Sequence, residues 1–194
     1  MDAPRGAGAV LDRSGAYRYR LWRRWGDGPA VAFVLLNPST ADAGRDDPTL
    51  RRCAGFARRW GYGAVEIVNL FAYRCTDPRG LRAAADPVGP GNDRHLRRAV
   101  RGAALVVAGW GAGGRLAGRD RAVADWLARA VPERLACLGL TRAGCPRHPL
   151  HLPGGAAPQP WRPDAPGPRL NGDAAGRRDR RAGRRPPSPG AGRS

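Results

Sequence analysis

Four short apolar runs divide the chain, and the segments between them carry apolar residues at helical spacing. The runs cover residues 31–36, 65–68, 104–108 and 135–140. Each is almost continuously apolar, which is typical of parallel strands that are buried on both faces. Residues 17–22, Tyr-Arg-Tyr-Arg-Leu-Trp, alternate instead. That alternation predicts an edge strand that precedes the four core strands.

Three helices are predicted between the core strands. Asp47 and Pro48 have the residue types of an N-cap and a first helical turn, and apolar residues then recur at helical spacing up to Trp60. Asn92 or Asp93 is expected to cap a second helix, and a third is expected to end near Pro132. Strands that alternate with helices predict an α/β protein, a three-layer α/β/α sandwich around a mainly parallel four-stranded sheet.

One domain is expected over residues 14–161, with a flexible N-terminus over 1–13. Residues 162–194 are rich in Arg, Pro and Gly, and Leu170 is their only large aliphatic residue. Such a segment cannot bury enough apolar surface to offset its ordering entropy. We therefore predict a disordered tail over 162–194.

The chain is strongly basic, with a formal net charge of +18 and no lysine among its 34 basic residues. Residues 162–194 hold nine Arg and three Asp, so they contribute +6 and leave +12 for residues 1–161. A basic domain suits a polyanionic partner such as DNA or a nucleotide. A solvated arginine-rich surface explains the same charge, and the sequence leaves both interpretations open.

The cysteines, Cys53, Cys75, Cys137 and Cys145, form no CxxC pair. Their spacing does not fit a zinc site, so we predict no metal and no cofactor. We expect reduced thiols in a cytoplasmic, monomeric protein. The longest apolar run, Ala30–Leu36, is too short to cross a bilayer.

Polar residues follow each core strand, and the carboxyl ends of parallel strands line one crevice in which ligands bind. Asn37 and Ser39 follow the first run, and Asp42 lies three residues further on. The Asn37 amide can orient a water, and the Asp42 carboxylate can accept its proton. We assign Ser39 to substrate binding. A turn that leads into a helix cap is the plainer alternative for this stretch.

Further candidates follow the other strands. Asn69 offers a donor and an acceptor that can read the edge of a nucleobase. Trp110 and Gly111 begin a glycine-rich turn that lets the backbone approach a substrate. Arg147 can meet a phosphate, and His148 can donate to a developing anion. Each has a structural alternative. Asn69 can hold the following loop in place, Trp110 can pack in the core, and His148 can be an exposed loop residue.

The stretch from Tyr17 to Trp161 resembles the bacterial family called domain of unknown function 1643. The matching motifs include 37–42 (Asn-Pro-Ser-Thr-Ala-Asp), 46–49 (Asp-Asp-Pro-Thr), 60–63 (Trp-Gly-Tyr-Gly), 68–71 (Val-Asn-Leu-Phe), 76–78 (Thr-Asp-Pro), 86–90 (Asp-Pro-Val-Gly-Pro), 110–111 (Trp-Gly) and 147–150 (Arg-His-Pro-Leu).

The order of these motifs is also distantly similar to that of the uracil-DNA glycosylase superfamily. That resemblance implies a fold of the same type, with Asn37 positioning water, Asn69 reading the base and His148 stabilising the departing base. The implied activity is hydrolysis of the N-glycosidic bond of a nucleobase in nucleic acid or a nucleotide. The alternative is a non-catalytic module that binds nucleic acid or a nucleotide on the same fold.

Overall fold

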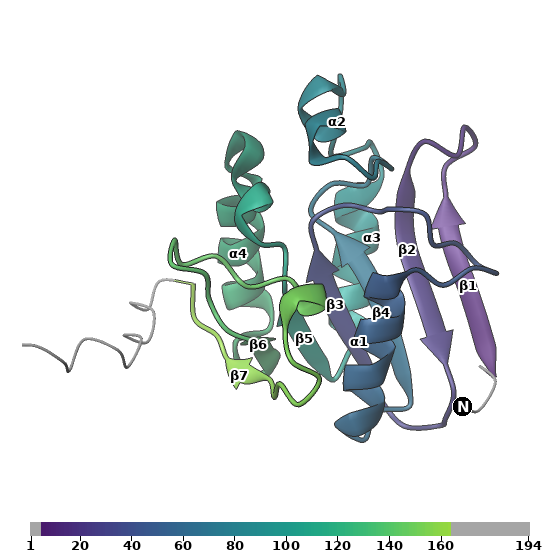
Figure 1. The fold of residues 1–194 in the computed structure, drawn as a ribbon, viewed down its shortest axis with the longest axis vertical. Coiled ribbons are helices and arrows are strands. Elements are labelled where there is room, and N and C mark those ends of the chain that lie inside the picture. The colour runs from purple at the N-terminus through teal and green to yellow at the C-terminus, as the bar shows by residue number, and fades with distance from the viewer. Residues whose placement is uncertain (1–4, 164–194) are drawn as a thin grey trace, which may run out of the picture.

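A computed structural model describes residues 5–163 and forms a mixed α/β domain (Figure 1). Its centre is a seven-stranded sheet of order β1-β2-β4-β3-β5-β6-β7. Four adjacent strands are parallel and coincide with the predicted apolar runs: β3 (Ala30–Leu35), β4 (Ala64–Asn69), β5 (Leu105–Ala108) and β6 (Leu135–Cys137). The prediction of a four-stranded sheet was wrong because antiparallel strands extend this block on both sides.

Three strands lie outside the parallel block. β2 (Arg18–Arg24) pairs antiparallel with β4, β1 (Gly6–Leu11) pairs with β2, and β7 (Gln159–Pro160) pairs with β6. The predicted edge strand is therefore an inner strand. The sequence predicts a flexible N-terminus over residues 1–13, whereas the structure pairs residues 6–11 with β2. Their Gly-Ala-Gly-Ala sequence carries almost no apolar signal.

Helices cover both faces of the sheet. α1 (Pro48–Arg59) packs on one face, in a core that includes Phe33 and Ile67. α3 (Asn92–Gly102) and α4 (Arg119–Ala130) pack on the other, with Val34 and Val68. Neighbouring strand residues thus enter different cores, as the pleat requires. The remaining short elements are α2 (Pro78–Ala83) and the 3₁₀ helices η1 (Ala112–Gly118), η2 (Pro132–Arg134) and η3 (Pro149–His151).

The helix starts test the capping predictions. The Asp47 carboxylate accepts a hydrogen bond from the Leu50 amide at 2.7 Å, which confirms Asp47 as the N-cap of α1. The prediction for α3 was wrong, because neither Asn92 nor Asp93 caps it. Gly91 holds the cap position, and the fully buried Asn92 donates to the carbonyl oxygens of Asn69 and Leu70 at 3.0 and 2.9 Å. Asn92 therefore fixes the end of β4 against α3.

The last described residues belong to this body. Trp161 is buried, and its amide donates to the Leu135 carbonyl at 3.0 Å. The predicted disordered tail lies, from residue 164 onward, outside the described residues. Within residues 5–163, no helix is both long and apolar enough to cross a membrane.

Candidate functional site

A cavity of about 560 Å³ lies beyond the carboxyl ends of β3 and β5. We call it the central cavity. Its walls come from the turns after these two strands, from Thr49 of α1, from the Cys75-Thr76 segment and from the loop over residues 141–151. Of the eight candidate site residues, six line it: Asn37, Ser39, Trp110, Gly111, Arg147 and His148. Turns far apart in the sequence therefore supply one site.

Asn37 is half-buried, and its side chain has a fixed orientation. Its Nδ2 donates to the carbonyl oxygens of Pro38 at 3.0 Å and Cys75 at 2.7 Å, and it lies 3.3 Å from the Cys75 Sγ. No residue among 5–163 donates a hydrogen bond to its Oδ1. Asn37 thus presents an acceptor that a water or a substrate N–H can use.

His148 is a neutral imidazole at physiological pH. Burial, reinforced by neighbouring His151, lowers its pKa from 6.5 to about 4, although the Asp47 carboxylate acts in the opposite direction. Its Nδ1 accepts the Leu150 amide hydrogen at 3.3 Å and caps η3. Because Nδ1 is an acceptor, the ring proton resides on Nε2. His148 therefore carries one N–H that can donate to a developing anion without bringing a net charge.

The turn after β5 and the 141–151 loop are tied together. The amide of Gly111 donates to the Pro146 carbonyl at 2.8 Å, and Gly111 has φ +67°, a conformation that favours glycine. Arg147 follows Pro146 directly, and its side chain is exposed. Within residues 5–163 no carboxylate lies within 4.0 Å of its guanidinium. Arg147 is therefore a free cation on the wall of the central cavity.

The other two candidates, Asp42 and Asn69, do not line the central cavity. The Asp42 carboxylate accepts the amide hydrogens of Gly44 and Arg45, both at 2.9 Å, and these bonds lower its pKa. It closes the loop after β3 and is a weakened base. Asn69 is 2% exposed, and its Oδ1 is buried without a partner among the described residues.

Two buried arginines of β2 hold the loop over residues 37–47. Arg18 donates to the Ala41 carbonyl at 2.6 Å, and Arg23 donates to the Asp42 carbonyl at 2.8 Å while pairing with Asp46 at 2.7 Å. Burial lowers the pKa of Arg18 to about 10, so it remains charged at neutral pH. The loop that begins with Asn37 is thus anchored from a strand on the far side of β4.

The segment after β4 is a part of the site that the sequence reasoning missed. Cys75 and Thr76 line the central cavity, and Cys75 contacts Asn37 as described. Burial and the Asp77 carboxylate raise the pKa of the Cys75 thiol, which keeps it protonated. The available signal was Thr76-Asp77-Pro78, because Asp77 caps α2 and marks an ordered turn at that point.

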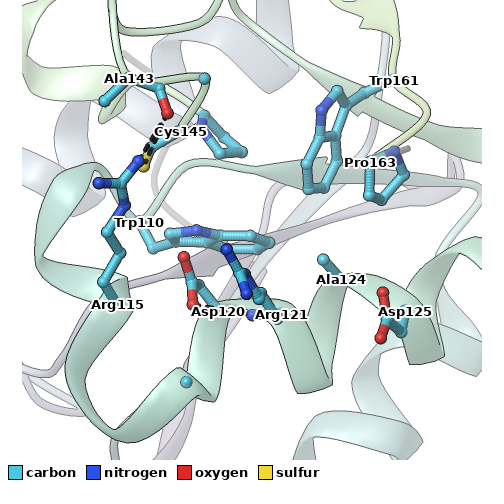
Figure 2. Close-up of a pocket in the computed structure, with 13 residues that line it drawn as sticks. Trp110, Arg115, Asp120, Arg121, Ala124, Asp125, Ala143, Cys145, Trp161 and Pro163 are labelled. Carbon is cyan, nitrogen blue, oxygen red and sulfur yellow. Dashed lines mark hydrogen bonds between the residues drawn. The ribbon is translucent and has the colours of Figure 1, made fainter. Parts of the chain in front are cut away.

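Trp110 also lines a second hollow of about 590 Å³, which we call the α4 hollow (Figure 2). The indoles of Trp110 and Trp161 meet edge to face at 5.4 Å, and Asp120, Arg121 and Asp125 enter from α4 (Figure 2). Arg115 closes one side by donating to the Ala143 carbonyl at 2.7 Å. Acidic and basic side chains balance here, so the α4 hollow has no clear preference for an anion or a cation.

Comparison with known protein families identifies a family for this chain. A family model described as "Protein of unknown function (DUF1643)" matches residues 18–150, which include every residue of the central cavity except His151. No curated protein and no solved structure matches the chain. These comparisons therefore do not show the similarity to the uracil-DNA glycosylase superfamily.

Proposed function

The chain belongs to the family of proteins of unknown function DUF1643, and from the chemistry of its central cavity we propose that it hydrolyses the N-glycosidic bond of a nucleobase in nucleic acid or a nucleotide. The observation that carries the proposal is that two complementary polar groups line the same cavity. Asn37 offers an oriented acceptor, and His148 offers an uncharged N–H donor.

The size and lining of the central cavity suit a nucleotide. Its volume of about 560 Å³ lies within the range of roughly 300–1,000 Å³ that is usual for small-molecule sites. The Gly111 backbone permits the close approach of a base, and Arg147 offers a cation to a phosphate, whereas Trp110 is packed in the core and only 2% exposed. Asn69 lies outside the cavity, so the proposal does not depend on it as a base reader.

The reaction breaks the bond between the sugar C1′ and the base nitrogen. The bonding electron pair leaves with the base, and the Nε2–H of His148 donates to the resulting anion. A water held by the Asn37 Oδ1 forms the new bond to C1′, and its proton passes through solvent to the departed base. A neutral donor is suited to this step because its hydrogen bond strengthens as charge develops in the transition state.

The test uses purified protein and oligonucleotides that carry uracil or one of a panel of damaged bases, with base release as the readout. Asn37→Ala is expected to lower kcat by about 100-fold or more while substrate affinity stays close to that of the wild type. His148→Asn is the matched variant for the donor. It keeps an acceptor for the Leu150 amide but removes Nε2, and it is expected to lower kcat by about 100-fold.

One observation favours a second function, a non-catalytic nucleic-acid- or nucleotide-binding module. No Asp or Glu is among the described residues that line the central cavity, so the cavity contains no carboxylate base. The two functions give opposite results in the same assay. A wild-type protein that binds the oligonucleotides, releases no base from any of them and binds equally well after Asn37→Ala is a binding module, and the hydrolase proposal then fails.

A further inference from the structure

A basic hollow adjoins the central cavity on the α1 side. It measures about 370 Å³ and is lined by Arg51, Arg52 and Arg59 of α1 together with Leu150 and Gly154. We call it the α1 hollow. Leu150 lines both the α1 hollow and the central cavity, so the two spaces meet at this residue. An elongated ligand can therefore occupy both.

The arginines of the α1 hollow carry uncompensated charge. Within residues 5–163 none of them has a carboxylate within 4.0 Å. Arg51 donates to the backbone carbonyl of Asp46 at 2.8 Å, and the Arg52 guanidinium lies 5.8 Å from the centre of the Phe56 ring. Neither contact neutralises a positive charge. The α1 hollow is thus an anion-attracting surface.

Two of these guanidinium groups converge. The NH1 atoms of Arg52 and Arg59 each lie 3.6 Å from the position that a Cβ would take at Gly154, so they are at most 7.2 Å apart. Charge-assisted N–H···O bonds to phosphate are about 2.8 Å long. Two guanidinium groups this close can donate to two oxygens of a single phosphate, whose charge relieves their repulsion.

A third arginine-lined hollow adjoins the central cavity at other residues than the α1 hollow does. It measures about 270 Å³, is lined by Arg82 and Arg115, and shares Leu36 and Ala112 with the central cavity. The central cavity, with Arg147 on its wall, therefore adjoins two arginine-lined hollows. One phosphate of a free nucleotide cannot occupy both hollows, whereas separate phosphates of one strand can.

We propose that the α1 hollow binds the phosphodiester backbone of a nucleic-acid strand whose target nucleotide occupies the central cavity, so that the substrate is a polymer. This inference rests on the proposed function for the identity of the target nucleotide. It makes a separate claim about binding, which can be tested whether or not a base is released.

The experiment measures the binding of the full-length protein to a fluorescein-labelled single-stranded 12-mer by anisotropy, at several salt concentrations. Arg52→Gln/Arg59→Gln is the test variant. Arg101→Gln/Arg129→Gln is its matched control, because it removes the same charge from exposed positions on the opposite helical layer. Thermal melts establish that both variants are folded. Unlabelled DNA and RNA 12-mers of the same sequence and polyglutamate are added as competitors in parallel titrations.

The test variant is expected to bind the 12-mer about tenfold more weakly, with a salt slope reduced by about 0.7 for the one phosphate that the two arginines share. The control is expected to keep the wild-type slope. If the two variants lose affinity equally, or if polyglutamate competes as well as the oligonucleotides, the α1 hollow is not a phosphodiester site and the inference is overturned. Selective loss in the test variant without base release supports the strand site and contradicts the hydrolase proposal alone.

Discussion

Protonation of His148 is expected to destabilise the folded protein. Its pKa falls from 6.5 to about 4 on folding. Between these two values the unfolded chain binds the proton and the folded chain does not, so stability rises with pH across this window. The contribution of neutral His148 to the unfolding free energy is fully present above pH 6.5 and is lost as the pH falls toward 4. The lowering of this pKa corresponds to at most about 3–4 kcal/mol of unfolding free energy, and the effect is smaller because solvent reaches part of the ring.

Urea denaturation at pH 7.5, 6 and 5 measures this effect against His148→Asn. The variant retains an acceptor for the Leu150 amide but has no group that titrates in this range. Between pH 7.5 and 5 the wild type is expected to lose about 2 kcal/mol more unfolding free energy than the variant. Other titrating groups, including His95, whose pKa burial also lowers, are common to both proteins. Parallel pH profiles for the two proteins would show that His148 titrates normally, and the neutral-donor reasoning would fail.

Two further predictions concern the elements around the central cavity. Asp47→Ala removes the N-cap of α1 and is expected to lower the unfolding free energy by about 1–2 kcal/mol in urea, whereas Asp47→Asn should preserve most of it. Gly114→Ala would place a Cβ against the Trp110 ring and 2.9 Å from Leu70 Cδ1, and is expected to cost about 1–3 kcal/mol. Gly102→Ala, whose Cβ would have nothing within 4 Å, is its control in thermal melts. Equal melting temperatures for the two glycine variants would contradict the packing argument.

The parallel block could be predicted because its signals are local. Each core strand is an almost continuous apolar run, interrupted only by Glu66 in β4, and polar turns follow the first three runs directly in the sequence. β1 could not be predicted in this way, since small alternating residues such as Gly8 and Ala9 form a strand only because β2 supplies its hydrogen-bond partners. The seven-stranded sheet therefore depends on tertiary pairing that no window of the sequence contains.

The position of a site residue could likewise be predicted from the sequence, but its hydrogen-bond partners could not. Asn37 and His148 lie in turns whose positions follow from the strands, and both line the central cavity. Asp42 differs because its carboxylate finds two amides within its own loop, and Asn92 differs because its partners are carbonyl oxygens of a distant strand. Residue type and spacing indicate which hydrogen bonds or proton transfers a side chain can make. The folded chain determines which partner it has.

The anchoring of the 37–47 loop by Arg18 and Arg23 limits how this site can be transplanted. A protein engineer who moved only the strand-end turns onto another parallel sheet would leave the Ala41 and Asp42 carbonyls without their donors. The orientation of Asn37 would then have to be rebuilt from new contacts. The smallest portable unit includes β2 as well as the turns. Substitutions in β2 are therefore expected to tune the site while touching no residue that lines it.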